Sequence, residues 1–299
     1  MGGVKPAEPV AVSYRGADGN RIAGVRFGDG GAPVLLLHGA GQTRYAWTRT
    51  GGALASVGFR AIALDQRGHG ESDWVADGAY AFEDFGRDAL AICRAIRDES
   101  GEPPILVGAS LGGIAGLIAS HATESEILKA LVLVDVTPSL ALAGLLRIRA
   151  FMAEHLETGF ASLEEAAEAV ARYQPGRSRP PSLDGLSRNL RRQADGRFHW
   201  HWDPALLLSS RNVMSGGEEG AVQLRAAAAA FRAPALLVKG GASDLVTAPE
   251  VEEFLRLVPH AGFVDIADAG HMVAGDRNDV FAAAILGFLE ALSPNAAKR

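Results

Sequence analysis

Short, largely apolar runs recur along the chain and alternate with longer stretches whose apolar positions follow a helical period. Such a run is typical of a strand that is buried on both faces of a sheet. The runs that predict strands are residues 33–38, 59–65, 104–109, 128–135, 234–239 and 262–267. The stretches that predict helices are residues 44–57, 83–97, 111–121, 249–258 and 280–292. This alternation predicts an α/β fold with a mostly parallel, doubly wound sheet.

Two segments depart from the alternation. Residues 9–27 predict two further strands around an Ala-Asp-Gly turn, which is a hairpin signal. Residues 138–232 contain no strong buried-strand run and predict helices over 140–156, 162–172 and 183–192. The simplest organisation is one core, residues 1–137 and 233–299, interrupted by a helical insertion.

Composition and charge restrict the function classes. The 299 residues are 48% hydrophobic and 21% charged, as in a globular protein with a sizeable core. A net charge of −6 argues against a nucleic-acid partner and an anionic membrane partner, and no apolar run is long enough to span a bilayer. The N-terminal residues lack a signal-peptide pattern, and the single cysteine, Cys93, excludes an intrachain disulfide. We therefore expect a cytoplasmic protein whose partner is a small-molecule substrate, with an oligomeric state that the sequence does not indicate.

The candidate chemistry centres on Ser110, within the Gly-Ala-Ser-Leu-Gly sequence of residues 108–112. A strand-like run ends before this sequence and a helix-like stretch follows it. This context predicts a sharp strand-to-helix turn that exposes the serine hydroxyl at the top of the sheet. Because a serine hydroxyl is a weak nucleophile, it needs a base, a group that orients the base, and donors for the oxyanion.

The candidate base is His271, in a loop between the last predicted strand and the last predicted helix. The candidate acid is Asp244, just past the strand-like residues 234–239. Asp135, just past the apolar residues 131–134, is the alternative acid, and its structural interpretation is a hydrogen-bonding residue of a turn. Both carboxylates follow predicted strands at the sheet edge where loops gather, so both can reach a histidine there.

Two backbone N–H groups are candidate oxyanion donors. Leu111 directly follows the serine at a helix N-terminus, where the helix dipole favours negative charge. Ala40 lies in a glycine-rich turn with His38, Gly39 and Gly41, whose small residues let the backbone approach a substrate closely. These turn residues are therefore also candidates for the border of the substrate pocket.

Residues 199–203 alternate histidine with tryptophan and end in aspartate. This H-x-H-x-D pattern resembles the first ligand block of the metallo-β-lactamase superfamily, so a zinc site has to be considered. That pattern normally continues with another histidine, whereas Pro204 follows here and no second ligand block appears downstream. We expect no metal site. Because the residue types alternate, one pair should face inward, and Trp200 or Trp202 is expected to line the substrate pocket.

Five elements of the chain resemble the α/β-hydrolase superfamily, in the branch with a serine nucleophile and a helical cap. They are the His-Gly-x-Gly turn at 38–41, the D-x-R-G-x-G-x-S loop at 65–72, the serine elbow at 108–112, the acid loop at 240–244 and the histidine loop at 270–271. The resemblance implies the α/β-hydrolase fold, a cap formed by residues 138–232, and a triad of Ser110, Asp244 and His271. In the loop 65–72, His69 is expected to hold the turn together and not to act in catalysis.

The resemblance is specific for the fold and less specific for the reaction. We expect a serine hydrolase that cleaves a carboxylic ester or lactone of a small, largely apolar substrate through an acyl-enzyme, without a cofactor. A serine at position 110 argues against the relatives whose nucleophile is aspartate and which act on epoxides or haloalkanes. Two alternatives stay open: a carbon–carbon bond hydrolase that acts on a ring-fission diketone, and a ligand receptor of the same fold with slow turnover.

Overall fold

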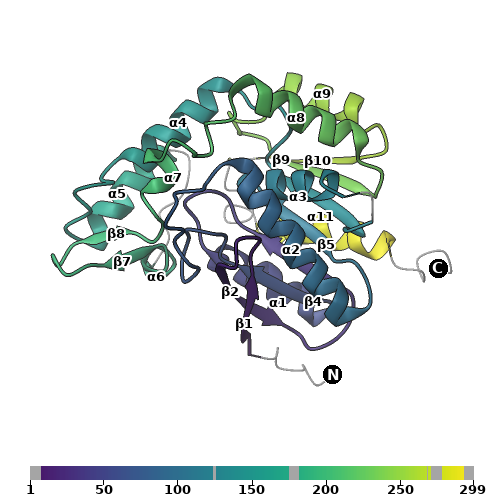
Figure 1. Cartoon of the computed structure of the whole chain (residues 1–299), viewed down its shortest axis with the longest axis horizontal. Coiled ribbons are helices and arrows are strands. Elements are labelled where there is room, and N and C mark those ends of the chain that lie inside the picture. Colours follow the sequence, from purple (N-terminus) through teal and green to yellow (C-terminus); the bar gives the residue numbers. More distant parts are fainter. Residues whose placement is uncertain (1–7, 124–125, 175–181, 268, 271–277, 293–299) are drawn as a thin grey trace.

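The computed structural model describes residues 8–123, 126–174, 182–267, 269–270 and 278–292. An eight-stranded sheet forms its centre, in the order β1-β2-β4-β3-β5-β6-β9-β10 (Figure 1). The strands are β1 (Val10–Arg15), β2 (Arg21–Phe27), β3 (Pro33–Leu37), β4 (Arg60–Leu64), β5 (Ile105–Ala109), β6 (Ala130–Val134), β9 (Ala235–Gly240) and β10 (Gly262–Ile266). β1 and β2 form an antiparallel hairpin, β2 pairs antiparallel with β4, and the strands from β4 to β10 run parallel. The mostly parallel α/β sheet predicted from the sequence is confirmed.

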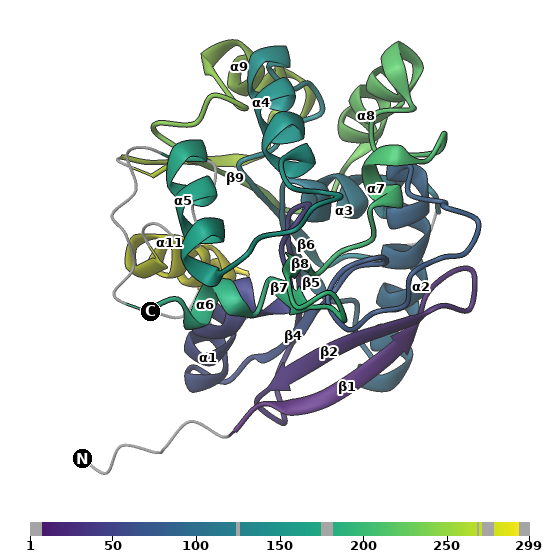
Figure 2. The same ribbon diagram turned by 90° about the vertical axis from the view of Figure 1, so that its left-hand side faces the viewer.

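Helices cover both faces of the sheet (Figure 2). Helices α2 (Phe82–Ser100) and α3 (Leu111–His121) pack on one face, and α1 (Thr48–Ser56) and α11 (Asn278–Ala291) pack on the other. Strand β3 contributes to both of the resulting cores, with Leu35 and Leu37 in one and Val34 and Leu36 in the other. Because every residue of β3 is buried, the strand has a continuous apolar sequence and not an alternating one.

Two further helices follow the prediction closely. The stretch expected to be helical over 44–57 begins as a 3₁₀ helix, η1 (Arg44–Trp47), and continues as α1. Helix α9 (Ala248–Leu257) lies between β9 and β10. Its N-terminus carries a capping box, in which the Glu250 side chain accepts a hydrogen bond of 2.9 Å from the backbone N–H of Thr247.

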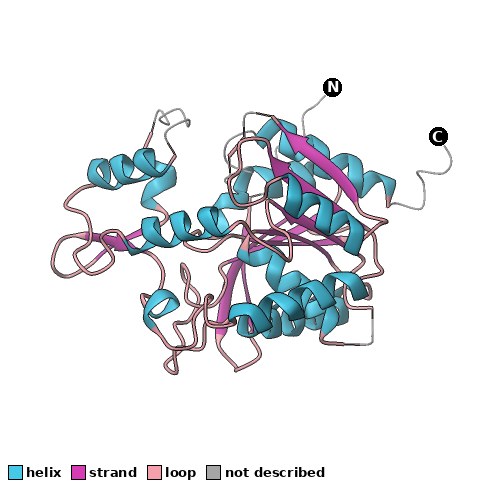
Figure 3. Ribbon diagram, turned by 90° about the horizontal axis from the view of Figure 1, so that it is seen from above, coloured by secondary structure: helices cyan, strands magenta, loops and turns pink. Residues whose placement is uncertain are grey.

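Between β6 and β9 the chain forms the insertion, which we define as residues 138–232. It comprises α4 (Leu142–Ala153), α5 (Leu163–Tyr173), α6 (Asp184–Ser187), β7 (Leu190–Arg192), β8 (Phe198–Trp200), α7 (Ala205–Leu208) and α8 (Gly217–Ala230). Seen from above in Figure 3, much of the insertion projects to one side of the sheet and its helices. Helix α8 packs against α3 of the core.

The prediction of a helix over residues 183–192 is wrong. Only α6 is helical there, and β7 then pairs antiparallel with β8. The turn between these strands contains Asp195 and Gly196, and Gly196 has a φ of 81°, which favours glycine. The N–H of Gln193 donates to the carbonyl of Arg197 over 3.0 Å and closes the hairpin. An Asp-Gly pair is itself a hairpin signal, so the correct structure was available in the sequence.

No helix in the described part of the chain combines the length and the apolar composition needed to cross a membrane.

Candidate active site

Ser110 occupies a strained turn between β5 and α3. Its φ of 47° lies in the left-handed region, where a residue other than glycine costs about 1–3 kcal/mol. The turn is held by main-chain hydrogen bonds, because Ser110 N–H donates to Val134 over 3.0 Å and its carbonyl accepts from Gly113 over 2.9 Å. The strand-to-helix turn expected at this serine is therefore present.

Glycine is required on both sides of this turn. A Cβ atom on Gly108 would lie 2.3 Å from the carbonyl carbon of Gly112. A Cβ atom on Gly112 would lie 2.4 Å from the backbone oxygen of Leu37 in β3. These contacts involve backbone atoms, which a side-chain rotation cannot move. The two glycines thus allow β5, α3 and β3 to approach closely enough to place the serine at the sheet edge.

This close approach predicts opposite effects for two glycine substitutions. Gly112→Ala is expected to lower the free energy of unfolding by about 2–3 kcal/mol, because the new methyl group overlaps the backbone of β3. The control is Gly52→Ala in α1, where an added Cβ meets no atom within 4 Å. That control should raise the free energy of unfolding by about 0.5–1 kcal/mol, the helical preference for alanine. Urea unfolding of the two variants measures both, and equal stabilities would contradict the packing argument.

The glycine turn, which we define as residues 38–42, faces the serine. A Cβ atom on Gly39 would lie 3.3 Å from the Cβ of Ser110, so the two backbones are in close contact. Gly39 N–H donates to the Gln42 side-chain oxygen over 3.0 Å, and Gln42 N–H returns to the Gly39 carbonyl over 3.2 Å. Gly41 N–H donates to His69 Nε2 over 3.1 Å. Within the described residues, the structure gives no partner for the N–H of Ala40.

Leu111 offers a second N–H beside the serine. It is the first residue of α3, and the first N–H groups of a helix have no partner within the helix. The structure gives no other partner for this N–H among the described residues. Ala40 and Leu111 therefore present donors on the two segments that adjoin Ser110, where a helix N-terminus and a tight turn favour a negative charge.

Two neutral histidines, His38 within the glycine turn and His69 outside it, join the turn to a neighbouring loop. Burial lowers the pKa of His38 to about 4. Burial and the neighbouring His38 lower the pKa of His69 to about 3. The hydrogen bonds assign one tautomer to both rings. His38 Nδ1 donates to Gly39 over 2.8 Å and its Nε2 accepts from Gln66 over 3.0 Å, whereas His69 Nδ1 donates to Arg67 over 2.9 Å.

The arginine loop, which we define as residues 65–72, contains Gln66 and His69, the partners of the glycine turn in these bonds. The Asp65 carboxylate accepts from the backbone N–H of Arg44 over 2.6 Å and of Glu71 over 3.0 Å. Arg67 is fully buried and pairs with Asp88, with one guanidinium nitrogen 2.6 Å from the carboxylate. The Asp65 carboxylate also pairs with the Arg44 guanidinium, so both buried carboxylates have a cationic partner within the fold. The loop is thus a fixed base for the glycine turn, in agreement with the structural role expected for His69.

Asp135 is buried at the end of β6, one strand away from Ser110. Its φ of 50° is also in the left-handed region. Its carboxylate accepts from the Gly240 N–H over 3.0 Å and from the Ser243 hydroxyl over 2.6 Å. Gly240 in turn lies against the histidine loop, because a Cβ atom there would be 2.3 Å from the Gly270 oxygen. Asp135 therefore adjoins the segment that leads directly to His271, which itself lies outside the described residues.

Asp244 has different surroundings, on the side of the insertion. Its carboxylate oxygens lie 2.9 Å from Nε and 3.1 Å from Nη2 of Arg147 in α4. Its side chain is 37% exposed. Its backbone also contacts α4, since a Cβ atom on Gly144 would lie 2.5 Å from the Asp244 oxygen. The carboxylate that the sequence favours as the acid is thus engaged by the insertion.

In residues 199–202, where histidine alternates with tryptophan, the two tryptophans are buried and the two histidines are partly exposed. Trp200 packs edge-on against Phe151 and Phe160, with ring centroids 5.5 and 5.1 Å away. Trp202 approaches the glycine turn, because its indole nitrogen lies 3.7 Å from the position of a Cβ atom on Gly41. Among the residues that the structure describes, no group of three potential metal ligands comes together, including the two histidines of this segment.

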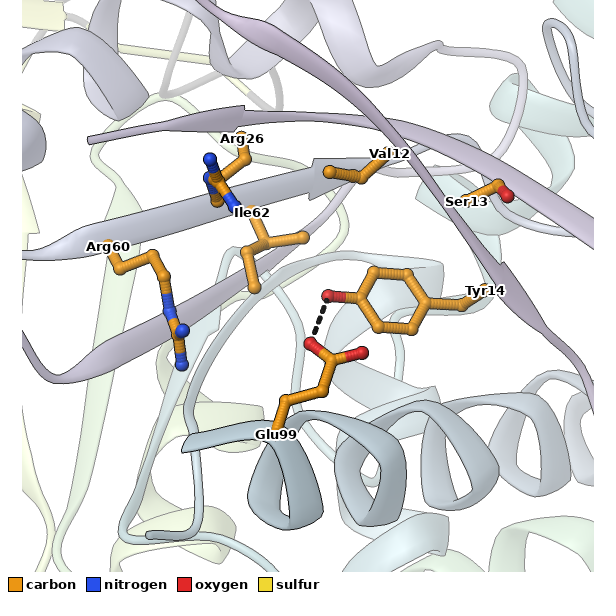
Figure 4. A pocket seen from close by; sticks show the side chains of 7 residues that line it. All are labelled: Val12, Ser13, Tyr14, Arg26, Arg60, Ile62 and Glu99. Atoms are coloured by element: carbon orange, nitrogen blue, oxygen red, sulfur yellow. Dashed lines mark hydrogen bonds between the residues drawn. The ribbon is translucent and has the colours of Figure 1, made fainter. Parts of the chain in front are cut away.

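A separate cavity of about 270 Å³ lies far from this constellation along the sheet, between β1, β2, β4 and the end of α2. Figure 4 shows the Tyr14 hydroxyl pointing toward the Glu99 carboxylate, to which it donates over 3.3 Å, with Arg26 and Arg60 nearby. None of the residues that line this cavity belongs to the segments around Ser110. It plays no part in the chemistry considered for the serine.

Comparison with known proteins identifies a matching family and several similar proteins. Residues 34–284 match the model of the alpha/beta hydrolase family. The chain is 29% identical to esterase Rv0045c of Mycobacterium tuberculosis over 278 residues, which cover 90% of this chain and 86% of that protein. It is 27% identical to a 3-hydroxybutyrate-oligomer hydrolase of Cupriavidus necator over 266 residues, which cover 84% of this chain and 87% of that protein.

Solved structures share the fold over nearly the whole chain. The crystal structure of E-2-(acetamidomethylene)succinate hydrolase has a TM-score of 0.78 at 22% identity, and covers 95% of this chain and 100% of that chain. At that identity the likeness shows the fold alone. The Mycobacterium tuberculosis esterase Rv0045c has a TM-score of 0.73 at 28% identity, and covers 96% of this chain and 94% of that chain.

Proposed function

The chain belongs to the alpha/beta hydrolase family, and on that premise we propose that it is a serine hydrolase that cleaves a carboxylic ester or lactone through an acyl-enzyme. One observation carries the proposal. Ser110 stands on a strained turn between two backbone N–H groups, of Ala40 and Leu111, for which the described structure gives no partner. This combination provides a nucleophile and two donors for the oxyanion that forms when it attacks a carbonyl.

In the proposed reaction, Ser110 Oγ attacks the carbonyl carbon and its proton passes to His271. The oxyanion accepts hydrogen bonds from Ala40 and Leu111. The intermediate then releases the alcohol, which takes the proton back from the histidine, and the acyl group remains on the serine. Water repeats the sequence on the acyl-enzyme and releases the acid. The scheme uses only protein groups and requires no cofactor.

We assign the acid that orients the histidine to Asp135, although the sequence motif favours Asp244. Two contacts support this assignment. The Asp135 carboxylate is buried and joined through Gly240 to the residue before His271, whereas the Asp244 carboxylate is paired with Arg147. A buried carboxylate beside the histidine stabilises the imidazolium that forms during the reaction more strongly than one that another cation neutralises.

The surroundings of the serine support a small, largely apolar substrate. Trp202 and Met152 adjoin Gly41, and elsewhere in the insertion Phe151 packs against Trp200. We propose that the insertion acts as a cap and that Trp202 lines the substrate pocket. The names of the two curated relatives, an esterase and a hydrolase of 3-hydroxybutyrate oligomers, favour an ester over a carbon–carbon bond.

The test is turnover of 4-nitrophenyl butyrate, followed by labelling with a fluorophosphonate and mass spectrometry of the labelled peptide. We expect repeated turnover, and one label per chain on Ser110. A release of one equivalent of nitrophenol without further turnover would favour the receptor alternative. Faster cleavage of a vinylogous diketone than of any ester or lactone would favour the carbon–carbon hydrolase. A label on a different residue would overturn the role of Ser110.

A further inference from the structure

We propose that His69 is a positioning residue, which fixes the glycine turn so that the Ala40 N–H points at the reacting carbonyl oxygen. The inference rests on the proposed function, because it concerns the donor for the oxyanion. His69 does not touch the substrate in this proposal. It acts through Gly41, whose N–H donates to His69 Nε2 over 3.1 Å.

Hydrogen bonds with the arginine loop hold the glycine turn at His38 and at Gly41. Gly41 has a φ of 76°, so the turn is built around a residue with wide conformational freedom. The Gly39–Gln42 hydrogen bonds close the turn on itself but do not attach it to the rest of the fold. The Gly41 bond to His69 attaches the second half of the turn to the arginine loop, and the bonds that Gln66 donates to the His38 ring and carbonyl attach its first half.

The His69 ring is held rigidly, in the tautomer whose Nε2 accepts a hydrogen bond. Its ring is fully buried and its Nδ1–H is taken by the Arg67 carbonyl over 2.9 Å, which leaves Nε2 as an acceptor. The low pKa caused by burial keeps the ring neutral, so Nε2 retains its lone pair. A protonated ring could not accept from Gly41.

Contacts with the insertion hold the backbone of His69 in place. His69 forms an isolated antiparallel bridge with Trp202. On either side of it, Gly70 N–H donates to His201 over 2.7 Å and Asp203 N–H donates to Gly68 over 2.8 Å. Main-chain bonds to residues 201–203 of the insertion therefore hold the backbone on both sides of the acceptor for Gly41.

The experiment compares two substitutions of His69. His69→Leu fills similar space but removes the acceptor, and His69→Gln retains an amide oxygen that can accept from Gly41. Loss of an oxyanion donor typically costs about 10²–10³-fold in kcat, and a donor that is present but poorly placed should cost less. We expect kcat of His69→Leu to fall about 10–100-fold with KM unchanged, and kcat of His69→Gln to stay within about 5-fold of wild type. His121→Leu, at an exposed histidine at the end of α3, is the matched control and should leave kcat unchanged.

Two readouts separate positioning from a structural role. The affinity for an aldehyde or trifluoromethyl ketone analogue, which forms an oxyanion on the serine, should fall with kcat. Hydrogen exchange of the Gly41 amide should accelerate in His69→Leu but not in His69→Gln, and this measurement needs no substrate. Unchanged kcat and unchanged Gly41 exchange in a folded His69→Leu protein would overturn the inference. Equal losses in the Leu and Gln variants would also overturn it, because the acceptor would then not matter.

The two proposals fail in different ways. If wild-type protein hydrolyses no ester, the proposed function fails, while Gly41 exchange still reports whether His69 holds the turn. If wild type is active and His69→Leu keeps its kcat, the proposed function stands and the positioning role is lost.

Discussion

Replacement of Ser110 by alanine is expected to lower kcat for an aryl ester by about 10⁴-fold or more, because no other group can form the acyl-enzyme. The free energy of unfolding should stay close to the wild-type value. The Ser110 hydroxyl is not needed for the turn, which is held by its backbone N–H and carbonyl. Steady-state turnover and urea unfolding of the same preparation measure the two effects together.

The control for this variant is Ser120→Ala. Ser120 lies in α3, ten positions along the chain, and its hydroxyl donates to the Leu117 carbonyl over 2.7 Å within the helix. This substitution should leave kcat unchanged. Substantial turnover in folded Ser110→Ala protein would mean that the reaction does not pass through an ester on Ser110.

The second large effect is expected for Asp135→Asn, which should lower kcat about 10³–10⁴-fold, because the amide no longer stabilises the imidazolium or selects its tautomer. The fold should tolerate this change. The amide oxygen can still accept from the Gly240 N–H, and the Ser243 hydroxyl can accept from the amide nitrogen where it now donates to Asp135. The measurement is kcat for 4-nitrophenyl butyrate, together with the thermal midpoint to verify the fold.

Asp244→Asn is the matched variant, since it makes the same chemical change in the other carboxylate. It removes the charge that pairs with Arg147 on a half-exposed surface, so we expect kcat within about 5-fold of wild type and a loss of stability below about 1 kcal/mol. The reverse pattern, a severe loss in Asp244→Asn and near-normal activity in Asp135→Asn, would return the acid to the position that the sequence motif indicates.

The choice between Asp135 and Asp244 as the acid shows which features of the site can be predicted from the sequence and which cannot. Asp135 and Asp244 both follow strands of the sheet, and this much was predicted from the apolar runs before them. Which carboxylate adjoins the histidine loop depends on Arg147, 97 positions away from Asp244, and on the Gly240 backbone. A side chain's partner across such a separation follows from the packing of the insertion on the core, which no local pattern encodes.

Other features could be predicted from short sequence patterns. The elbow at Ser110 and the buried strand β3 follow from short patterns of glycine and apolar residues, because their physical causes are local sterics and burial. The β7–β8 hairpin was missed because the helical spacing of apolar residues before it outweighed an Asp-Gly turn that was also visible. His69 was expected to hold a turn together, but its partner Gly41 became apparent only when the two loops were placed side by side.

The main-chain bonds between the arginine loop and the insertion bear on how this protein can be re-engineered. Gly70 donates to His201 and Asp203 donates to Gly68, so the two segments share a small piece of sheet-like structure. A chimaera that exchanges the insertion for that of a relative would cut this structure unless residues 66–70 are exchanged with it. Crossovers at the two ends of the insertion are therefore not sufficient, and two further crossovers, one on each side of residues 66–70, have to be added.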